Sequence, residues 1–277
     1  MVEETKTKTK INTDTETEEK TEIETKVKKV KKTVEKEKKE EEKIDEEKIK
    51  KGNFGIRIDE MTEKGLHLGH QTAKLNPKMS VYIVGIRNTI HIINLEKTAV
   101  CLEKALKFIS ELTKEKGTML MVGTKAPLKK LIQETAIRCN LPYIVERWLG
   151  GIFTNFKVVS ERTKYYGDLV DQKQKGEFEK FIKKEKIRKE KQLVKMGKKF
   201  EGIKNLEKMP EAIFICDINK DKLALKEAKM KGVKVVAIVD TNVNPSLVDF
   251  PIPASDDSIL SVKYILDKIE EAIKIEN

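Results

Sequence analysis

The residues best suited to chemistry are histidines and aspartates in separate parts of the chain. His67 and His70 stand three positions apart around Gly69. This spacing fits a metal site, a contact with RNA phosphate, or a polar loop held by its own hydrogen bonds. Because the pair lacks the helix and the glutamate of a hydrolytic zinc motif, the spacing by itself favours the polar loop.

A second group of polar residues directly follows apolar, strand-like runs. Its members are Gly123-Thr124-Lys125, Arg147, Asp217 and Asp240-Thr241-Asn242. Ligands of doubly wound α/β folds bind at the carboxyl ends of strands, so Asp217 and Asp240 invite comparison with an acidic phosphorylation or magnesium site. However, the sequence lacks the G-x-x-x-x-G-K spacing of a phosphate loop, a GxGxxG and a GxSxG. We therefore expect neither catalysis nor a small-molecule substrate.

The elements that would position these residues alternate regularly. Apolar runs predict strands, and amphipathic runs predict helices, one of them capped by Thr124. The expected strands are 81–86, 90–95, 118–123, 142–145, 212–216, 233–239 and 252–254, and the expected helices include 96–116, 221–231 and 258–275. Strands that alternate with helices indicate a mainly parallel sheet covered on both faces. The predicted fold is α/β, doubly wound and flavodoxin-like.

Charge favours a polyanionic partner. Across 277 residues, 57 Lys and Arg oppose 46 Asp and Glu, for a formal net charge of +11. Aromatic residues make up only 5%, so contact with a nucleic-acid backbone is expected rather than stacking on bases. Three widely spaced cysteines predict reduced, buried thiols in a cytosolic protein. No apolar run approaches the length of a membrane span, so no membrane partner is expected.

Two segments depart from the α/β pattern. Residues 1–52 are a low-complexity Lys/Glu/Thr extension that cannot bury enough apolar surface to order itself, so we expect it to be disordered. Residues 53–277 would form the α/β domain, interrupted by a basic helical hairpin at 156–208. Residues 157–208 hold 17 Lys and Arg against 9 Asp and Glu. An inserted coiled-coil hairpin with outward lysines is expected there, and a plain charged pair of surface helices is the alternative.

The chain is organised around the stretch Arg147-Trp148-Leu149-Gly150-Gly151, between the predicted strand at 142–145 and the arm. Adjacent glycines let the backbone turn sharply and approach a neighbour closely. This stretch is therefore interpreted as the hinge at which the arm begins. Trp148 is predicted to pack this hinge rather than to stack on a base.

Several motifs occur together and in a fixed order. They are Gly65-Leu66-His67-Leu68-Gly69-His70-Gln71, Asn76-Pro77-Lys78-Met79, Arg87-Asn88, His91-Ile92-Ile93-Asn94-Leu95, Val122-Gly123-Thr124-Lys125, Arg147-Trp148-Leu149-Gly150-Gly151, Thr154-Asn155, Pro210-Glu211-Ala212 and Ala237-Ile238-Val239-Asp240-Thr241-Asn242. From about residue 56 to 273 the chain closely resembles the ribosomal protein S2 family in its bacterial form. The first fifty residues have no counterpart in the common family pattern, and the second arm helix is richer in lysine than usual.

The resemblance implies the same sandwich with an inserted helical hairpin. It also implies a structural role in the small ribosomal subunit, in the cytoplasm, with binding to small-subunit ribosomal RNA at the head–body junction on the solvent side. It further implies that the protein helps to dock the multi-OB-fold ribosomal protein that captures messenger RNA. An extra-ribosomal RNA-binding scaffold and a flavodoxin-like enzyme with an RNA-binding arm are the alternatives.

The predicted RNA contacts are cations and amides in the motifs and along the arm. They are Lys78, Arg87, Asn88, Lys125, Arg147, Asn155, Lys157, Arg162, Lys164, Lys183, Lys184, Lys186 and Arg188. If the family fold holds, the loops of His70, Asp240 and Asp257 (or Asp256) meet at one end of the sheet. One imidazole and two carboxylates suit zinc or a similar divalent ion, although no cofactor is required and a hydrogen-bonded His–Asp cluster is the alternative.

Overall fold

A parallel sheet of five short strands forms the centre of the fold. A computed structural model describes residues 54–274, and the predicted extension of residues 1–52 lies outside them. The strands are β4 (Met119–Val122), β5 (Tyr143–Ile144), β6 (Ala212–Ile215), β7 (Lys234–Val239) and β8 (Phe250–Pro253), in the order β5-β4-β6-β7-β8. All four pairings are parallel. Numbered along the chain, this order is 2-1-3-4-5, which confirms the flavodoxin-like prediction.

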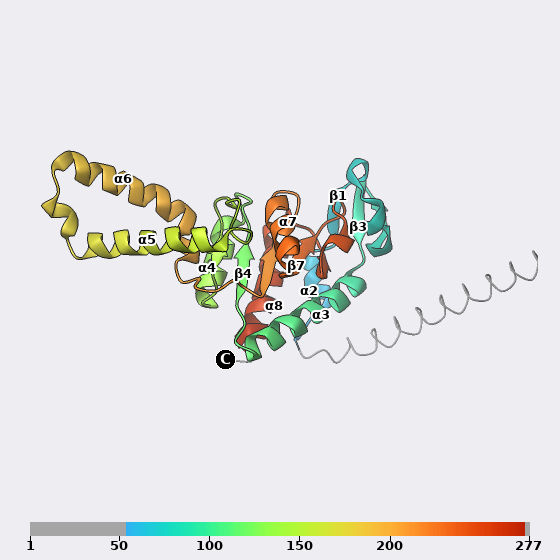
Figure 1. The fold of residues 1–277 in the computed structure, drawn as a ribbon. Helices are drawn as coiled ribbons and strands as arrows, with labels where there is room; N and C mark the ends of the chain where they lie inside the picture. The colour runs from blue at the N-terminus through green and yellow to red at the C-terminus, as the bar shows by residue number, and fades with distance from the viewer. Residues whose placement is uncertain (1–53, 275–277) are drawn as a thin grey trace, which may run out of the picture. The chain divides into compact units, whose positions relative to one another are not determined.

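Helices cover the sheet, which explains why its strands are almost continuously apolar. Helix α8 (Ile259–Lys274) contacts both α3 (Leu95–Lys114) and α4 (Lys129–Arg138). Helix α7 (Lys222–Lys231) packs against alternate residues of the strands and against the hinge. This apolar cluster contains no residue of α3 or α8, so α7 covers the other face of the sheet. Figure 1 shows α7 and α8 on different sides of the strands.

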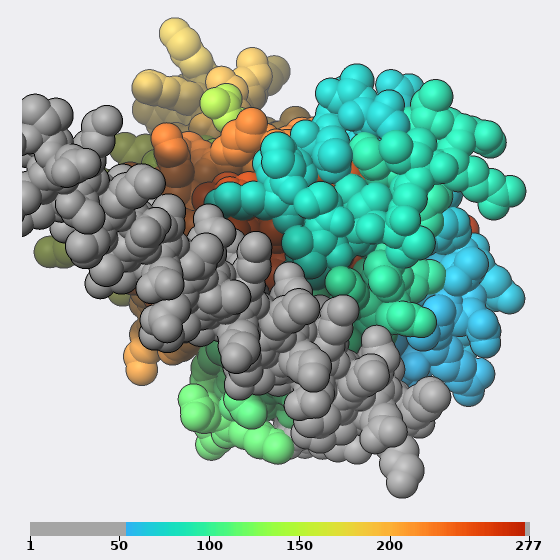
Figure 2. Space-filling view, turned by 90° about the vertical axis from the view of Figure 1, so that its right-hand side faces the viewer, coloured from blue at the N-terminus to red at the C-terminus, as the bar shows by residue number. Residues whose placement is uncertain are grey.

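A small antiparallel sheet precedes this core. Its strands β1 (Leu68–Gln71), β3 (Ile90–Ile93) and β2 (Ile83–Arg87) lie in that order, after the short helix α2 (Ile58–Glu63). Two predictions were wrong here. The segment around His70 is a strand rather than a loop, because it pairs with β3. Residues 77–82 form the 3-10 helix η2 (Pro77–Tyr82), so the next strand begins at Ile83. The surface of this region is visible in Figure 2.

Thr124 does not cap the following helix, which contradicts the prediction. Helix α4 begins only at Lys129, and Thr124 is buried. Its backbone N–H and its hydroxyl both donate hydrogen bonds to the carboxylate of Asp221, at 3.3 and 2.9 Å. A buried carboxylate needs hydrogen-bond donors. Thr124 supplies them to Asp221 instead of capping the helix.

The arm is a helical hairpin, as expected. Helix α5 (Phe156–Gln174) leads through the 3-10 helix η3 (Glu177–Lys180) to α6 (Lys183–Phe200) and η4 (Glu201–Ile203). Figure 1 shows α5 and α6 running side by side beyond the edge of the sheet. The two helices share a narrow apolar seam, in which Tyr166, Leu169, Phe178 and Phe200 are buried. Ile182, just before the first turn of α6, and Val194 lie outside this seam, 74% and 60% exposed.

Two further 3-10 helices, η1 (Thr72–Lys74) and η5 (Pro245–Leu247), lie in loops. Ile259, at the start of α8, is 48% exposed. All three cysteines are free; Cys216 is buried, whereas Cys101 and Cys139 are half-buried. Within residues 54–274, no helix combines the length and apolar character that crossing a membrane requires.

Candidate nucleic-acid interface and acidic cluster

The carboxyl ends of the parallel strands gather a set of charged side chains with one histidine from β1. We call this set the acidic cluster, and its members are His70, Lys125, Asp217, Asp240, Asp256 and Asp257. Each aspartate follows the end of β6, β7 or β8, and Lys125 follows β4, because parallel strands all end at the same edge of the sheet. The predicted meeting of His70, Asp240, Asp256 and Asp257 is therefore observed.

His70 and Lys125 each face several carboxylates. Nδ1 of His70 lies 3.0 Å from Oδ2 of Asp240, and Nε2 lies 3.5 Å from Oδ2 of Asp257. The ammonium of Lys125 lies 2.6 Å from Asp257, 3.0 Å from Asp256 and 3.6 Å from Asp217. Four carboxylates thus gather around one ammonium and one imidazole, and this excess of negative charge favours a further cation.

The pKa values follow from this crowding. The carboxylate of Asp240, 3.0 Å from Nδ1, raises the pKa of His70 above its ordinary value, against the effect of burial. Burial raises the pKa of Asp256 to about 6, and the nearby charges of Asp240 and Asp217 add to the shift. The ammonium of Lys125 lowers the pKa of Asp257. Burial would lower the pKa of Lys125, but its carboxylate partners outweigh burial and raise it.

Three members of the cluster fit a divalent ion. His70, Asp240 and Asp256 each offer one ligand atom, and these atoms lie within 4.8 Å of one another. Nδ1 of His70 is buried and makes no well-aligned hydrogen bond within the described residues, which leaves it available as a ligand. Tetrahedral zinc would separate its ligands by roughly 3.4 Å, so only a small closure of the side chains would be needed.

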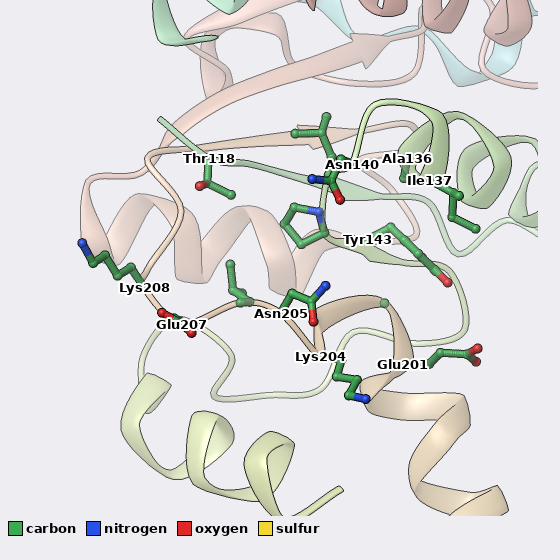
Figure 3. Close-up of a pocket in the computed structure, with 14 residues that line it drawn as sticks. Thr118, Ala136, Ile137, Asn140, Tyr143, Glu201, Lys204, Asn205, Glu207 and Lys208 are labelled. Carbon is green, nitrogen blue, oxygen red and sulfur yellow. The ribbon is translucent and has the colours of Figure 1, made fainter. Parts of the chain in front are cut away.

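A hollow away from the acidic cluster offers no comparable chemistry. It lies between the loop after η4 and the start of β5, and Figure 3 shows its charged side chains Glu201, Lys204, Glu207 and Lys208 spread along the loop without converging. Pockets that bind small molecules place a few polar groups so that they converge on the ligand. This hollow gives no support for a small-molecule substrate.

The predicted RNA-contacting residues fall into separate groups. Lys78 is exposed in η2, and Arg87 and Asn88 are exposed at the end of β2, where Asn88 and Thr89 form a tight turn with φ of 49° and 64°. A second group lies at the hinge and along α5, and a third at the start of α6. Their members are Arg147, Asn155, Lys157, Arg162 and Lys164, and then Lys183, Lys184, Lys186 and Arg188. Lys125 belongs to none of these groups, because it is held in the acidic cluster.

The hinge is organised by a buried glutamate that the sequence did not single out. Glu227 of α7 is 4% exposed. Its Oε1 accepts hydrogen bonds from the indole of Trp148 at 3.3 Å and from the amide of Gly151 at 2.8 Å. Its Oε2 accepts from the amide of Phe153 at 3.0 Å, and from the amide and hydroxyl of Thr154 at 3.3 and 3.4 Å. This carboxylate therefore ties the start of the arm to α7.

Trp148 packs the hinge, as predicted. It is 5% exposed and meets the ring of Phe153 edge-on, with centroids 5.1 Å apart. Gly151 has φ of +101°, a conformation that glycine adopts far more readily than other residues. Burial alone would raise the pKa of Glu227, but the donors of Gly151, Phe153, Thr154 and Trp148 lower it. The carboxylate is thus ionised where it holds the turn.

Further lysines of the second arm helix, which was expected to contact RNA through its lysines, lie at the root of the arm. Lys195, Lys198 and Lys199 lie at the end of α6, beside the hinge and the first turns of α5. Antiparallel pairing of the two helices brings them back to Arg162, more than thirty residues earlier in the chain. Their sequence signal was the lysine pattern that continues through residue 199.

Comparison with known proteins decides the family. A model of the family described as "Ribosomal protein S2" matches residues 61–275. The chain belongs to the ribosomal protein S2 family. Relatives named small ribosomal subunit protein uS2 include one from Dictyoglomus thermophilum (strain ATCC 35947 / DSM 3960 / H-6-12), which is 44% identical over 218 residues, covering 79% of this chain and 89% of the relative. Another, from Coprothermobacter proteolyticus (strain ATCC 35245 / DSM 5265 / OCM 4 / BT), is 41% identical over 79% of this chain and 81% of its own length.

Membership of the S2 family carries a structural role in the small subunit of the cytoplasmic ribosome, and with it a part in translation. The role that the family implies is structural rather than enzymatic. The acidic cluster and the basic arm are accordingly interpreted as parts of a ribonucleoprotein component rather than as a catalytic centre.

Proposed function

We propose that this S2-family chain binds small-subunit ribosomal RNA through its exposed cations, at the head–body junction on the solvent side of the subunit. One observation carries the proposal. Of the predicted contact cations, only Lys125 has an ion-pair partner within residues 54–274. The others, on the small sheet, the hinge and the arm, are left to neutralise phosphates. Their spread over separate surfaces suits recognition of RNA shape rather than base edges.

Salt dependence tests this proposal. Each phosphate contact should contribute about −0.7 to −0.9 to the slope of log K against log salt concentration. Replacing Lys183 and Lys184 by alanine should reduce the magnitude of that slope by roughly one for each phosphate that is no longer neutralised. Replacement of Lys229 and Lys231, on α7 and away from the arm, serves as the charge-matched control. The proposal fails if the purified protein has no salt-sensitive affinity for small-subunit ribosomal RNA.

We further propose that the chain helps to dock the multi-OB-fold ribosomal protein that captures messenger RNA. The family supports this role, and an exposed apolar edge offers a surface for a protein partner. Val84 and Ile86 on the edge strand β2 are 69% and 62% exposed, and Val81 is 62% exposed. Exposed apolar patches on a sheet edge mark sites of protein association. Val84→Lys should weaken co-sedimentation of that protein with the small subunit, and unchanged co-sedimentation would exclude this edge.

The acidic cluster is proposed to accept zinc or a similar divalent ion without needing one. Its ligands would be His70 and Asp240 with Asp256 or Asp257. A bound ion would supply positive charge that links β1 to the loops after β7 and β8. Lys125 already supplies part of that charge, so the fold would not require the metal.

A further inference from the structure

A cleft lies at the root of the arm, between the Gly150–Gly151 turn and the facing ends of α5 and α6. We call it the arm-root cleft; its volume is about 470 Å³. Its walls are largely apolar and come from Leu149, Val158, Val159, Met196 and Phe200. The volume falls within the range of roughly 300 to 1,000 Å³ that is typical of sites for small organic groups. The cleft is therefore large enough for one planar ring system, but too small for a double helix.

The rim of the cleft is positive. Arg162, Lys195 and Lys199 line it, and no acidic side chain does. None of these three has an ion-pair partner among the residues that the structure describes. A neighbouring hollow of about 330 Å³ shares Leu149, Gly150 and Lys199 with the cleft. It adds Arg147, Lys198 and one acidic residue, Glu146, whose carboxylate is paired with Lys129. A ligand with an apolar ring and a run of negative charge would match both the interior and the rim.

One wall of the cleft is held in place before any ligand arrives. The Gly150–Gly151 turn is fixed to α7 through the hydrogen bonds of Glu227 to Gly151, Phe153 and Thr154. A side chain on Gly151 would be strained at its φ of +101°. Because neither glycine has a side chain, this wall does not project into the cleft. A site that is already formed loses less conformational entropy on binding.

We propose that the arm-root cleft binds one unstacked nucleotide from a single-stranded region of RNA. The base would lie on the apolar floor, and the adjoining phosphates would face Arg162, Lys195 and Lys199. The chemistry supports this occupant because loops and bulges of RNA present splayed bases next to a continuous negative backbone. The inference rests on the proposed RNA-binding function and assigns a particular nucleotide contact to it.

Filling the cleft without changing its charge provides the test. Val158 lines the cleft and is 41% exposed, so Val158→Trp should occupy the cleft without burying a new group in the core. Ile187→Trp is the matched control, because Ile187 is 43% exposed on α6 and lines neither hollow. Both variants and the unaltered full chain are titrated with a transcribed bacterial small-subunit ribosomal RNA at several salt concentrations. Circular dichroism checks that each variant is folded.

The variants distinguish the contribution of the base to binding from the contribution of its phosphates. Val158→Trp should weaken binding roughly five- to hundredfold, the value of one stacked base, with an unchanged salt slope. Lys195→Ala with Lys199→Ala should lower the magnitude of the salt slope by about one per phosphate contact. Ile187→Trp should bind like the unaltered chain. If the unaltered chain binds RNA and Val158→Trp binds as tightly or more tightly, the cleft proposal is overturned while the proposed function stands.

Photo-cross-linking gives a second measurement that does not depend on the tryptophan variant. RNA containing 4-thiouridine should attach a nucleotide to peptides that contain Val158, Met196 or Phe200. In assembled small subunits, a cross-link from these peptides to a protein in place of RNA would overturn the proposal. Absence of any salt-sensitive RNA binding by the unaltered chain would instead remove the proposed function on which it rests.

Discussion

Removal of the carboxylate of Glu227 should loosen the hinge and destabilise the whole domain. In Glu227→Ala, the indole of Trp148, three amides and one hydroxyl lose their common acceptor. Glu227 and Phe153 are both buried, so water cannot replace the lost acceptor at the amide of Phe153 without opening this packing. Glu227→Gln keeps the shape and one acceptor oxygen, but it turns an amide group toward some of the donors.

The magnitude follows from the two shortest bonds, those from Gly151 at 2.8 Å and Phe153 at 3.0 Å. Hydrogen bonds to a charged group contribute about 1.5 to 3 kcal/mol each, so Glu227→Ala should lower the free energy of unfolding by about 3–6 kcal/mol. With a urea dependence of about 2 kcal/mol per M, the unfolding midpoint should fall by roughly 2 M. Glu227→Gln should lose about half as much.

The lowered free energy of unfolding can be measured by urea unfolding, with the fluorescence of Trp148 as the signal. Trp148 is the only tryptophan in the chain and lies at the hinge itself. Hydrogen exchange at the amides of Gly151, Phe153 and Thr154 should accelerate in Glu227→Ala even under native conditions. Lys226→Ala, at the preceding exposed position, is the control. If Glu227→Ala unfolds at the same urea concentration as the unaltered protein, with the same protection of these amides, the account of the hinge is wrong.

The pH dependence of the same carboxylate has a definite sign. The pKa of Glu227 is lowered in the folded protein, so its stabilisation is fully present above the ordinary value of 4.5. It is lost as the pH falls through the lower folded pKa. Between neutral pH and this acidic range, the unaltered protein should therefore lose more stability than Glu227→Gln. An equal loss in both proteins would show that the carboxylate is not ionised at the hinge.

Other predictions follow from the same structure. A Cβ on Gly202 would clash with the carbonyl oxygen of Tyr143, whereas a Cβ on Gly150 would meet nothing closer than 3.7 Å. Thermal unfolding should therefore show that Gly202→Ala is destabilised by about 2 kcal/mol or more and that Gly150→Ala is nearly unchanged. Metal analysis of purified protein should find a divalent ion that is absent from His70→Ala, and equal, negligible content in both would exclude the metal site. The thiol of Cys216 should resist a thiol reagent until the protein unfolds, because it is buried and its pKa is raised by burial; rapid reaction in the native state would contradict its position.

The sequence was most informative where both faces of an element are buried. Strands such as β7 are almost purely apolar because helices cover both sides, so composition alone predicted them. Strand β1, with the sequence Leu-Gly-His-Gln, was missed because it is only partly buried and its pairing partner β3 lies about twenty residues later. Its extended shape comes from that partner rather than from its own residue types.

The polar contacts were less predictable, because each depends on a residue far away in the chain. Thr124 has the sequence context of a helix cap, but its partner Asp221 lies 97 positions away. Glu227 stands among lysines in an amphipathic helix and resembles an ordinary exposed glutamate; only the fold brings the hinge amides to it. The meeting of His70 with Asp240 was expected only from the family resemblance, because His70 lies on β1, outside the parallel sheet that carries Asp240.

The position of the arm also affects how the chain can be shortened. Strand β5 has only two residues and stands at the edge of the parallel sheet, where unpaired backbone groups invite another strand. The segment that returns from the arm, η4, contacts β5, with the backbone of Gly202 close against Tyr143. This return segment therefore shields the edge from self-association. An arm deletion that removes residues 201–203 with the helices would expose β5 and promote aggregation, whereas one that ends at residue 200 would leave the sheet edge covered.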